Sequence, residues 1–297
     1  MRAVILGFGL IGGSVARAVR VVRPEADAPG WRLAAWSPTG RGPARAFDAG
    51  VVDEAPRDPG DAIRGADLVI LAAPPLACLD LLDALGGPLR SALGDALVTD
   101  VASTKRAIVA RAARNGLRFV GGHPMAGRET AGYDASDGTL FADRPWVVTP
   151  DGAADADVGT IEALARRCGA RPLVMDAAAH DAAVAAISHL PLVLSAALVE
   201  AVVGTMSAPR PDWPAAAALA ATGWRDMTRL ARGDVEMGAG IAATNADALV
   251  ARLRDVRAVL DAWIAELDAS DDVGPAPLAA RLRAARDVLG PPPEPGA

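Results

Sequence analysis

The chain has 297 residues, which is long enough to bury a large core and to form two domains. Its net charge of −6 argues against a nucleic-acid partner, so an anionic ligand must be held by local positive groups. Cys78 and Cys168 form no metal-spaced pattern, which indicates buried thiols, a reducing compartment and no metal. The chain opens on a strand-like run, so we expect a cytoplasmic protein without a leader peptide.

The first 175 residues alternate short apolar runs with segments of helical spacing. Near-continuous apolar strands of this kind predict a mostly parallel sheet that helices cover on both faces. We therefore expect an α/β, Rossmann-like domain over residues 1–176. The strand-like runs are RAVILG, RLAAWS, DLVILAAPP, DALVTD, LRFVGG, PWVVTP and RPLVMD, and the helical segments are 11–22, 75–85, 104–114 and 157–168.

The sequence GFGLIGGS follows the opening strand directly and leads into a helix. Its glycines permit a tight turn, close approach of a pyrophosphate and close packing of the helix on the strand. The free N–H groups at the start of that helix can bind phosphate. We therefore predict a dinucleotide site in which the cofactor contacts Gly7, Phe8, Gly9, Leu10, Ile11 and Gly12.

The second strand ends in AAWSPTGRGPAR and lacks the carboxylate that usually binds the ribose hydroxyls of NAD. Ser37, Thr39 and Arg41 instead suit a 2′-phosphate, so the pattern favours NADP over NAD as the cofactor. A solvent-exposed loop with an incidental arginine is the alternative.

Two later stretches end strands at the same carboxyl edge of the sheet. In LAAPP, Ala73 and Pro74 are expected beside the cofactor. TDVASTK places Asp100 near the cofactor, followed by Ser103 and by Lys105, the only lysine of the chain. Ser103 either caps the following helix or presents its hydroxyl to the ligand, and the two roles are compatible.

The next strand ends in GGHPMAG, which brings His123 to the edge where open α/β sheets bind ligands. Histidine is the natural general base near neutral pH, so His123 is a candidate proton acceptor. A satisfied buried polar group is the alternative. The glycine pair before the histidine indicates room for cofactor and substrate to approach the backbone.

From residue 177 the strand patterns stop, and alanine- and leucine-rich segments take their place. They predict an all-helical second domain over 177–272, followed by a short helix and a disordered, proline-rich tail over 273–297. The predicted helical segments are 178–204, 214–231 and 241–268.

Residues 182–203 are almost long and apolar enough for a membrane span. Polar residues and a proline interrupt the run, and no basic or aromatic flanks anchor it. We expect no membrane contact, but a helix that is buried on most sides, in part by a homodimer partner. The interrupting residues are Ser188, His189, Pro191, Ser195 and Glu200.

The helical region carries two groups of polar side chains. The first shares one flank of an apolar helix, in HDAAVAAISHLP, and comprises His180, Asp181, Ser188 and His189. By itself, His189 would indicate a core histidine. The second group is Arg225 and Arg229, one helical turn apart in GWRDMTRLA. Because arginine binds carboxylates through two hydrogen bonds, this pair fits either a substrate carboxylate or a structural ion pair.

In their order and spacing, these motifs resemble the prephenate/arogenate (cyclohexadienyl) dehydrogenase family of tyrosine biosynthesis. The resemblance covers about residues 1–245 and rests on GFGLIGGS, TDVASTK, GGHPMAGRE, LFADRPWVVTP, HDAAVAAISHLP and GWRDMTRLA. It implies an N-terminal Rossmann-like domain and a C-terminal helical dimerisation domain. It also implies an NAD- or NADP-dependent oxidoreductase that forms a homodimer.

Such enzymes oxidise a cyclohexadienol with loss of carbon dioxide: prephenate gives 4-hydroxyphenylpyruvate, and arogenate gives tyrosine. The resemblance implies that His123 takes the proton of the ring hydroxyl as hydride passes from C4 to the nicotinamide. It further implies that Ser103 orients that hydroxyl and that Arg225 clamps a substrate carboxylate. The other substrate contacts that it implies are Ser188, His189 and Glu129.

Three departures from the family pattern fall in or near the substrate-binding half. Leu192 replaces a second histidine, DVEMGAGI replaces a stretch that often contains proline and tryptophan, and Arg128 stands where a small or uncharged residue is common. They leave prephenate, arogenate and an amino-substituted prephenate as candidate substrates. A non-catalytic dinucleotide sensor is the other alternative. The absence of lysine after Lys105 counts against a helical-dimer hydroxyacid dehydrogenase.

Overall fold

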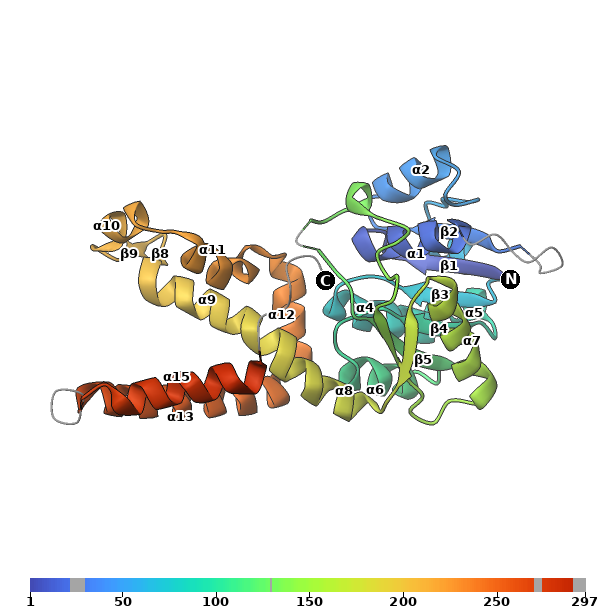
Figure 1. Ribbon diagram of the computed structural model, residues 1–297. Helices are drawn as coiled ribbons and strands as arrows, with labels where there is room; N and C mark the ends of the chain where they lie inside the picture. The colour runs from blue at the N-terminus through green and yellow to red at the C-terminus, as the bar shows by residue number, and fades with distance from the viewer. Residues whose placement is uncertain (22–29, 129, 270–273, 291–297) are drawn as a thin grey trace. The chain divides into compact units, whose positions relative to one another are not determined.

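A computed structural model describes residues 1–21, 30–128, 130–269 and 274–290. All seven predicted apolar runs form strands of one sheet, in the order β2-β1-β3-β4-β5-β6-β7 (Figure 1). The predicted α/β fold is therefore confirmed. The strands are β1 (Arg2–Leu6), β2 (Arg32–Trp36), β3 (Leu68–Leu71), β4 (Leu97–Asp100), β5 (Phe119–Pro124), β6 (Pro145–Thr149) and β7 (Arg171–Val174).

The strand directions bring several turns of the chain to one edge of the sheet. Strands β1 to β5 run parallel, β6 runs antiparallel to β5, and β7 is parallel to β6. The carboxyl ends of β1, β2, β3, β4 and β5 therefore meet at the edge where α/β sheets bind ligands. Pro124 pairs with Trp146, so the chain leaves β5 and returns into β6 at this same edge.

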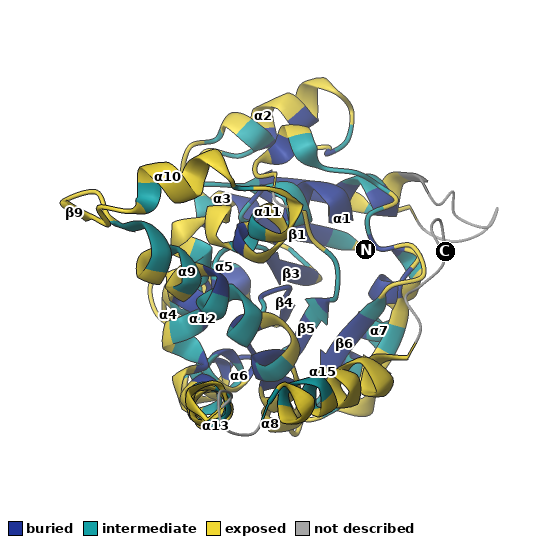
Figure 2. Ribbon diagram, turned by 60° about the vertical axis from the view of Figure 1, so that its left-hand side comes forward, coloured by how far each residue is buried: buried dark blue, intermediate teal, exposed yellow. Residues whose placement is uncertain are grey.

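Helices cover both faces of the sheet, as the alternating pattern predicts. Two core clusters result because successive residues of β1 point to opposite faces. Ile5 lies in the cluster that contains Val15, whereas Leu6 lies in the cluster that contains Leu82. Figure 2 shows the central strands buried between helices that expose their outer faces. The helices are α1 (Leu10–Val21), α2 (Arg41–Asp48), α3 (Pro59–Ile63), α4 (Pro75–Gly86), α5 (Arg90–Leu93), α6 (Arg106–Arg114) and α7 (Asp155–Arg167).

A helix of 27 residues, Ala177–Val203, starts the helical region. It comprises α8 (Ala177–Val184), the π-helical turn η2 (Ala185–His189) and α9 (Leu190–Val203). Among the described residues, it is the one helix that is long and apolar enough to cross a membrane by length and composition. Only 22% of its most apolar window is buried by this chain, so burial on most sides would need a partner and stays a prediction.

The rest of the helical region contains one pair of strands that the sequence did not predict. A short hairpin of β8 (Gly204–Thr205) and β9 (Ala208–Pro209) follows the long helix. Strands of two residues are too short to show an alternating pattern. After the hairpin come α10 (Trp213–Ala218), α11 (Thr222–Thr228), η3 (Leu230–Arg232) and α12 (Val235–Thr244), of which α11 and η3 pack against α9.

The chain divides into two compact units, Met1–Ala248 and Leu249–Ala297. The first unit holds the sheet together with α8 to α12, so the predicted boundary at residue 176 stays a prediction. The second unit holds most of α13 (Ala246–Asp268) and all of α15 (Ala276–Leu289). The latter is the short helix predicted after residue 273.

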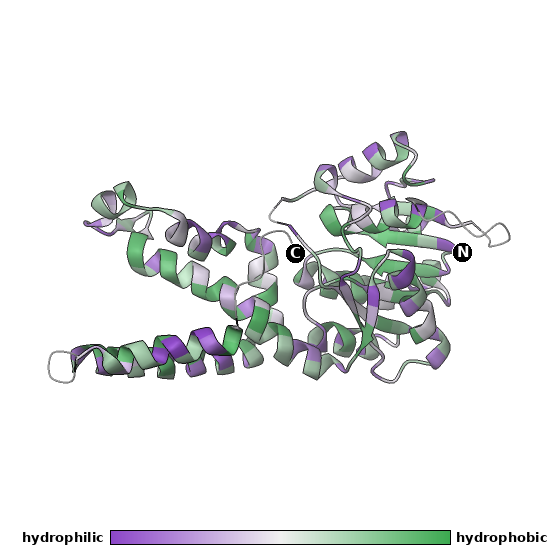
Figure 3. Ribbon diagram, in the orientation of Figure 1, coloured by the Kyte–Doolittle hydropathy of each residue, from purple (hydrophilic) through white to green (hydrophobic). Residues whose placement is uncertain are grey.

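The second unit is a pair of helices with a largely uncovered apolar surface. Glu266 and Arg281 form an ion pair between the two helices, and the Arg281 guanidinium lies 5.2 Å from the ring centroid of Trp263. Figure 3 shows hydrophobic residues along both helices. The large apolar side chains that are at least half exposed are Val259, Leu260, Ile264, Leu267, Leu282, Val288 and Leu289.

The glycine pair before His123 serves the packing of the sheet. A Cβ atom on Gly121 would overlap the hydroxyl of Thr149, its partner on β6. A Cβ atom on Gly122 would lie 2.6 Å from the carbonyl oxygen of Asp100 and close to the Trp146 ring. The expectation that these glycines leave room for cofactor and substrate is therefore wrong, because neighbouring strands fill that room.

Replacement of Gly122 by alanine is expected to lower the free energy of unfolding by about 1–3 kcal/mol, because backbone atoms of β4 would have to move. Chemical denaturation measures this change. Gly159→Ala is the matched control: a Cβ atom there meets nothing within 4 Å, and alanine is expected to stabilise α7. Equal stability of Gly122→Ala and the wild type would contradict this packing.

Candidate functional site

The glycine-rich turn between β1 and α1 has the shape of a phosphate cradle. Gly7 has a φ of +89°, and a Cβ atom there would overlap the carbonyl group of Ala72. A Cβ atom on Gly12 would lie 2.5 Å from the carbonyl oxygen of Gly7. Nothing lies within 4 Å of the Cβ position of Gly9, which leaves the start of α1 open to an anion. These residues therefore fit the pyrophosphate of a dinucleotide.

Phe8 packs beneath a loop that crosses this turn. It is 6% exposed, and its ring stacks on Tyr133 with centroids 5.4 Å apart. The guanidinium of Arg17 lies 4.8 Å from the centre of the Tyr133 ring. The side chain of Phe8 therefore faces this loop, whereas Leu10 and Ile11 begin α1 half-buried. Tyr133, the only tyrosine of the chain, was not among the residues predicted for the site.

Two further groups of predicted cofactor contacts lie at the same edge of the sheet. Ser37, Thr39 and Arg41 join β2 to α2. Within the described ranges of the chain, the Arg41 side chain has no hydrogen-bond or ion-pair partner. Ala73 and Pro74 join β3 to α4 and are half-buried. Both groups keep surface that a dinucleotide could contact.

Asp100 occupies the predicted edge, but its carboxylate is fully buried. It pairs with the Nζ of Lys105, which is also fully buried. It accepts the N–H of Ala102 at 3.0 Å and the N–H of Gly122 at 3.1 Å. Burial raises the pKa of Asp100, and the charge of Lys105 opposes that rise. The expected cofactor contact is thus corrected: Asp100 and Lys105 form an internal ion pair where β4 meets β5.

His123, near the end of β5, starts a chain of hydrogen bonds that leads to α8. Its Nδ1 lies 2.8 Å from the Nε2 of His180, and the two rings meet edge to face. The Nδ1 of His180 lies 2.8 Å from the Oδ1 of Asp181. His180 and Asp181 are buried, whereas His123 is half-buried and keeps surface for a ligand. His180 and Asp181 were predicted on one flank of a helix but not as part of the site.

The carboxylate of Asp181 also holds the start of α6. It accepts the N–H of Lys105 at 2.7 Å and the N–H of Arg106 at 2.9 Å. These are the free donors at the beginning of the helix, so Asp181 takes the capping role that was one alternative for Ser103. Ser103 is half-buried in the preceding loop, and its hydroxyl has no partner among the described residues.

The environment of His123 and His189 keeps these two rings neutral. Burial lowers the pKa of His123 well below its usual 6.5, and the neighbouring imidazoles and Lys105 lower it further. Burial also lowers the pKa of His189 to about 4, against the opposing charge of Asp181. Burial alone would raise the pKa of Asp181, but hydrogen bonds from His180 and from two N–H groups of the α6 start lower it. The site thus links a neutral His123 through His180 to the carboxylate of Asp181, and a neutral imidazole is what a general base requires.

Ser188 and His189 lie next to each other on the π-helical turn η2 but differ in exposure. Ser188 is exposed, whereas His189 is 1% exposed. The Nδ2 of Asn245 lies 3.2 Å from the Nδ1 of His189 and donates to the carbonyl oxygen of Asp181 at 2.8 Å. This placement matches the core alternative for His189. It differs from the expected substrate contact because the ring has almost no free surface.

No described contact joins the other predicted substrate residues to His123. Arg225 is exposed on α11, and its side chain has no ion pair or hydrogen bond within the described part of the chain. Glu129 lies outside the described residues. Arg128 pairs with Asp137 at 2.6 Å, and bonds from Thr139 and Arg128 lower the pKa of Asp137 to about 2. The ion pair with Asp137, in the same loop, therefore gives Arg128 a structural role.

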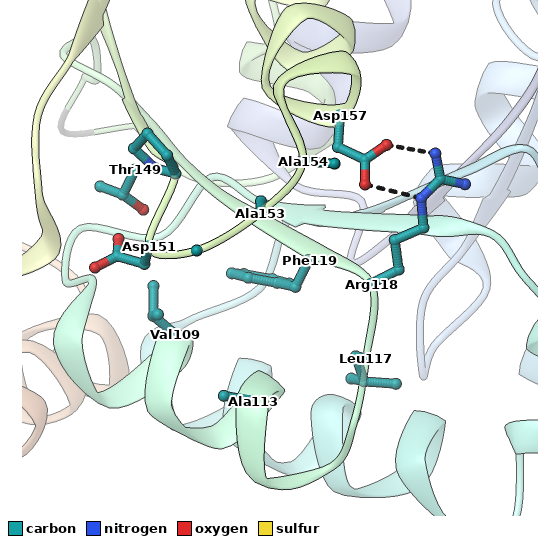
Figure 4. Close-up of a pocket in the computed structure, with 12 residues that line it drawn as sticks. Val109, Ala113, Leu117, Arg118, Phe119, Thr149, Asp151, Ala153, Ala154 and Asp157 are labelled. Atoms are coloured by element: carbon teal, nitrogen blue, oxygen red, sulfur yellow. Dashed lines mark hydrogen bonds and ion pairs between the residues drawn. The ribbon is translucent and has the colours of Figure 1, made fainter.

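A cavity of about 310 Å³ lies at the opposite edge of the sheet, between Phe119 at the start of β5 and Thr149 at the end of β6. Figure 4 shows Arg118 and Asp157 at its rim, where they satisfy each other through two hydrogen bonds. Its lining contains no histidine, cysteine or lysine, so we assign no chemistry to it. In the part of the chain that the structure describes, no group of three histidine, cysteine or acidic side chains could hold a metal ion.

Known proteins share both halves of this architecture. Residues 38–174 match the family described as prephenate dehydrogenase, nucleotide-binding domain, and residues 176–273 match prephenate dehydrogenase, dimerization domain. Prephenate dehydrogenase of Bacillus subtilis (strain 168) is 30% identical over 269 residues, which cover 89% of this chain and 67% of that protein. Cyclohexadienyl dehydrogenase of Zymomonas mobilis is 33% identical over 266 residues, which cover 89% and 85%.

A solved structure agrees with these sequence matches. The crystal structure of Synechocystis arogenate dehydrogenase has a TM-score of 0.76 to this chain at 31% sequence identity. The match covers 98% of this chain and 100% of that one. Because the two family domains match in order and relatives of at least 30% identity span most of the chain, the protein belongs to the prephenate dehydrogenase family.

Proposed function

We propose that the protein catalyses the oxidative decarboxylation of prephenate or arogenate, with NAD or NADP as hydride acceptor. The proposal depends most on one observation: half-buried His123 lies at the sheet edge that also holds the glycine-rich cradle. Burial lowers the pKa of His123 well below 6.5, which suits a proton acceptor. The names of the similar proteins, prephenate, cyclohexadienyl and arogenate dehydrogenase, support the reaction class. A non-catalytic dinucleotide sensor would not need a general base backed by a buried carboxylate.

The reaction needs a proton acceptor and a hydride acceptor. His123 takes the ring-hydroxyl proton at Nε2, the ring nitrogen that does not meet His180. A bound dinucleotide supplies the hydride acceptor for the hydrogen on the same ring carbon. The ring then loses carbon dioxide, and the electron pair of the broken C–C bond makes the ring aromatic. The phenolate oxygen recovers the proton from His123, so no proton is gained or lost overall.

Ser103 and Arg225 are the residues that we assign to orient the substrate. Among the described residues, neither the hydroxyl of Ser103 nor the exposed guanidinium of Arg225 has a partner. A guanidinium binds a carboxylate through two hydrogen bonds, and an acidic protein needs such a local cation to hold an anionic substrate. By family resemblance we place Ser188 and Glu129 around the substrate, and we assign His189 to the wall behind His123.

Turnover is expected with prephenate or arogenate in the presence of NAD or NADP, measured by the absorbance of the reduced nicotinamide. His123→Asn is expected to lower kcat by about 100- to 10,000-fold, because an amide cannot take the hydroxyl proton. Calorimetry should show unchanged dinucleotide binding, which separates lost chemistry from lost folding. Absence of turnover with all four combinations of substrate and cofactor would overturn the substrate assignment. An active His123→Asn would overturn the assigned base.

For the cofactor we propose a preference for NADP, on the basis of Arg41 and the nearby hydroxyls of Ser37 and Thr39. Arg41→Ala is expected to raise the KM for NADP by about 10- to 100-fold and to change the KM for NAD little. Arg45→Ala is the matched control, because Arg45 lies on the same helix but pairs with Asp134 at 2.5 Å. An equal change in the KM values for NADP and NAD in Arg41→Ala would contradict the preference for NADP.

We propose that the protein is a soluble, cytoplasmic homodimer joined through its helical region. The long helix Ala177–Val203 is mostly uncovered in one chain, and the helices of the second unit expose apolar side chains. The match to a dimerization domain over residues 176–273 supports the same region. The hydrogen bonds of Asp181 to the start of α6 fix the long helix to the sheet, which favours a protein surface over a membrane as its cover.

Light scattering at micromolar concentration is expected to give twice the 30.2 kDa mass of one chain. Ile264→Glu, on the exposed apolar surface of α13, is expected to shift the mass toward that of the monomer because it would place a charge in an apolar interface. A wild-type mass of one chain would contradict the homodimer.

A further inference from the structure

Asp181 determines which nitrogen of His180 carries hydrogen. An ionised carboxylate can only accept hydrogen bonds, so the Nδ1 of His180 must donate to the Oδ1 of Asp181, 2.8 Å away. The same oxygen accepts the backbone N–H of Lys105. In a neutral imidazole the other nitrogen holds a lone pair, so the Nε2 of His180 is an acceptor.

This constraint passes on to His123. Its Nδ1 lies 2.8 Å from the accepting Nε2 of His180, so the Nδ1 of His123 must carry the hydrogen. The Nε2 of His123 is then left with its lone pair. The opposite neutral arrangement would turn a lone pair of His180 toward the Asp181 carboxylate, which is unfavourable in a buried site.

We propose that His180 and Asp181 are positioning residues that fix the proton-accepting tautomer of His123 and accept its Nδ1 proton during turnover. This inference rests on the proposed function, in which His123 takes the ring-hydroxyl proton. As the substrate O–H bond breaks, an N–H bond forms at the Nε2 of His123. The Nδ1 proton of His123 then moves to the Nε2 of His180. Both transfers reverse when the phenolate oxygen recovers its proton.

The charges around the two rings favour this displacement of the proton. A positive charge on His123 would lie near the ammonium group of Lys105, which opposes it. A positive charge on His180 would instead lie 2.8 Å from the carboxylate of Asp181. We call this transfer through His123, His180 and Asp181 the relay. It moves the positive charge away from Lys105 and toward the carboxylate of Asp181. The other titratable and charged groups near the relay are Arg106, His189 and Asp100, the last of which pairs with Lys105.

Nitrogen NMR of the free protein tests the tautomer directly. The chain has only three histidines, so protein labelled with ¹⁵N at histidine gives a simple imidazole spectrum. Long-range proton–nitrogen correlation distinguishes protonated from unprotonated ring nitrogens. At neutral pH we expect hydrogen on the Nδ1 of both His123 and His180. Hydrogen on the Nε2 of His123 would overturn the proposal, whether or not any substrate is turned over.

His180→Phe keeps an aromatic ring but cannot accept a hydrogen bond from His123. We expect His123 to show both tautomers in this variant, and kcat to fall about 100-fold with a nearly unchanged substrate KM. Asp176→Ala is the matched control, because Asp176 caps the same helix by accepting the N–H of Ala179 at 2.8 Å. It should lower stability while the His123 spectrum and kcat stay unchanged.

The inference and the proposed function can fail separately. If neither prephenate nor arogenate is turned over but the free protein has hydrogen on the Nδ1 of His123, the proposed function fails and the tautomer stands. If His180→Phe changes neither the spectrum nor kcat, the relay is overturned and the proposed function stands. Should His180→Phe not fold, Asp181→Asn replaces it: its kcat should fall, and an unchanged kcat would overturn the relay.

Discussion

The carboxylate of Asp181 is the group on which the rest of the site depends. Its oxygens accept the first N–H groups of α6 and the ring N–H of His180. A buried carboxylate is costly unless its oxygens are bonded, and both oxygens of this one are. One side chain therefore fixes the start of the long helix to the sheet and orients the imidazole that meets His123. The attachment of the helical region to the sheet and the orientation of the ring that meets His123 therefore depend on the same carboxylate.

A buried ion pair also lies near His123, because Asp100 accepts the N–H of the preceding residue, Gly122. The ion pair of Asp100 and Lys105 has no exposed surface, and such pairs contribute little net stability. Its position beside the end of β5 gives it an electrostatic effect, because the ammonium group opposes a charge on the imidazole. The only lysine of the chain therefore adds to the effects of burial and of His180, which lower the pKa of His123 more strongly.

The strands and the glycine-rich turn could be predicted because burial on two faces and turn chemistry leave local patterns in a sequence. The burial of single polar residues leaves no such pattern, so Asp100 and His189 were expected at the ligand and instead lie inside. The link of His180 to His123 joins residues 57 positions apart, which no local spacing shows. Short elements such as α3, α5 and β8 hold too few residues for a period to be visible.

The pH dependence of kcat/KM tests most directly whether His123 acts as a neutral base in this environment. Its pKa lies well below 6.5, so the base form is present above that lowered value and is lost only as the pH falls through it. We expect kcat/KM to stay level on the acid side as the pH decreases through 6.5. A loss of activity with a midpoint near 6.5, as for a solvent-exposed histidine, would contradict the account.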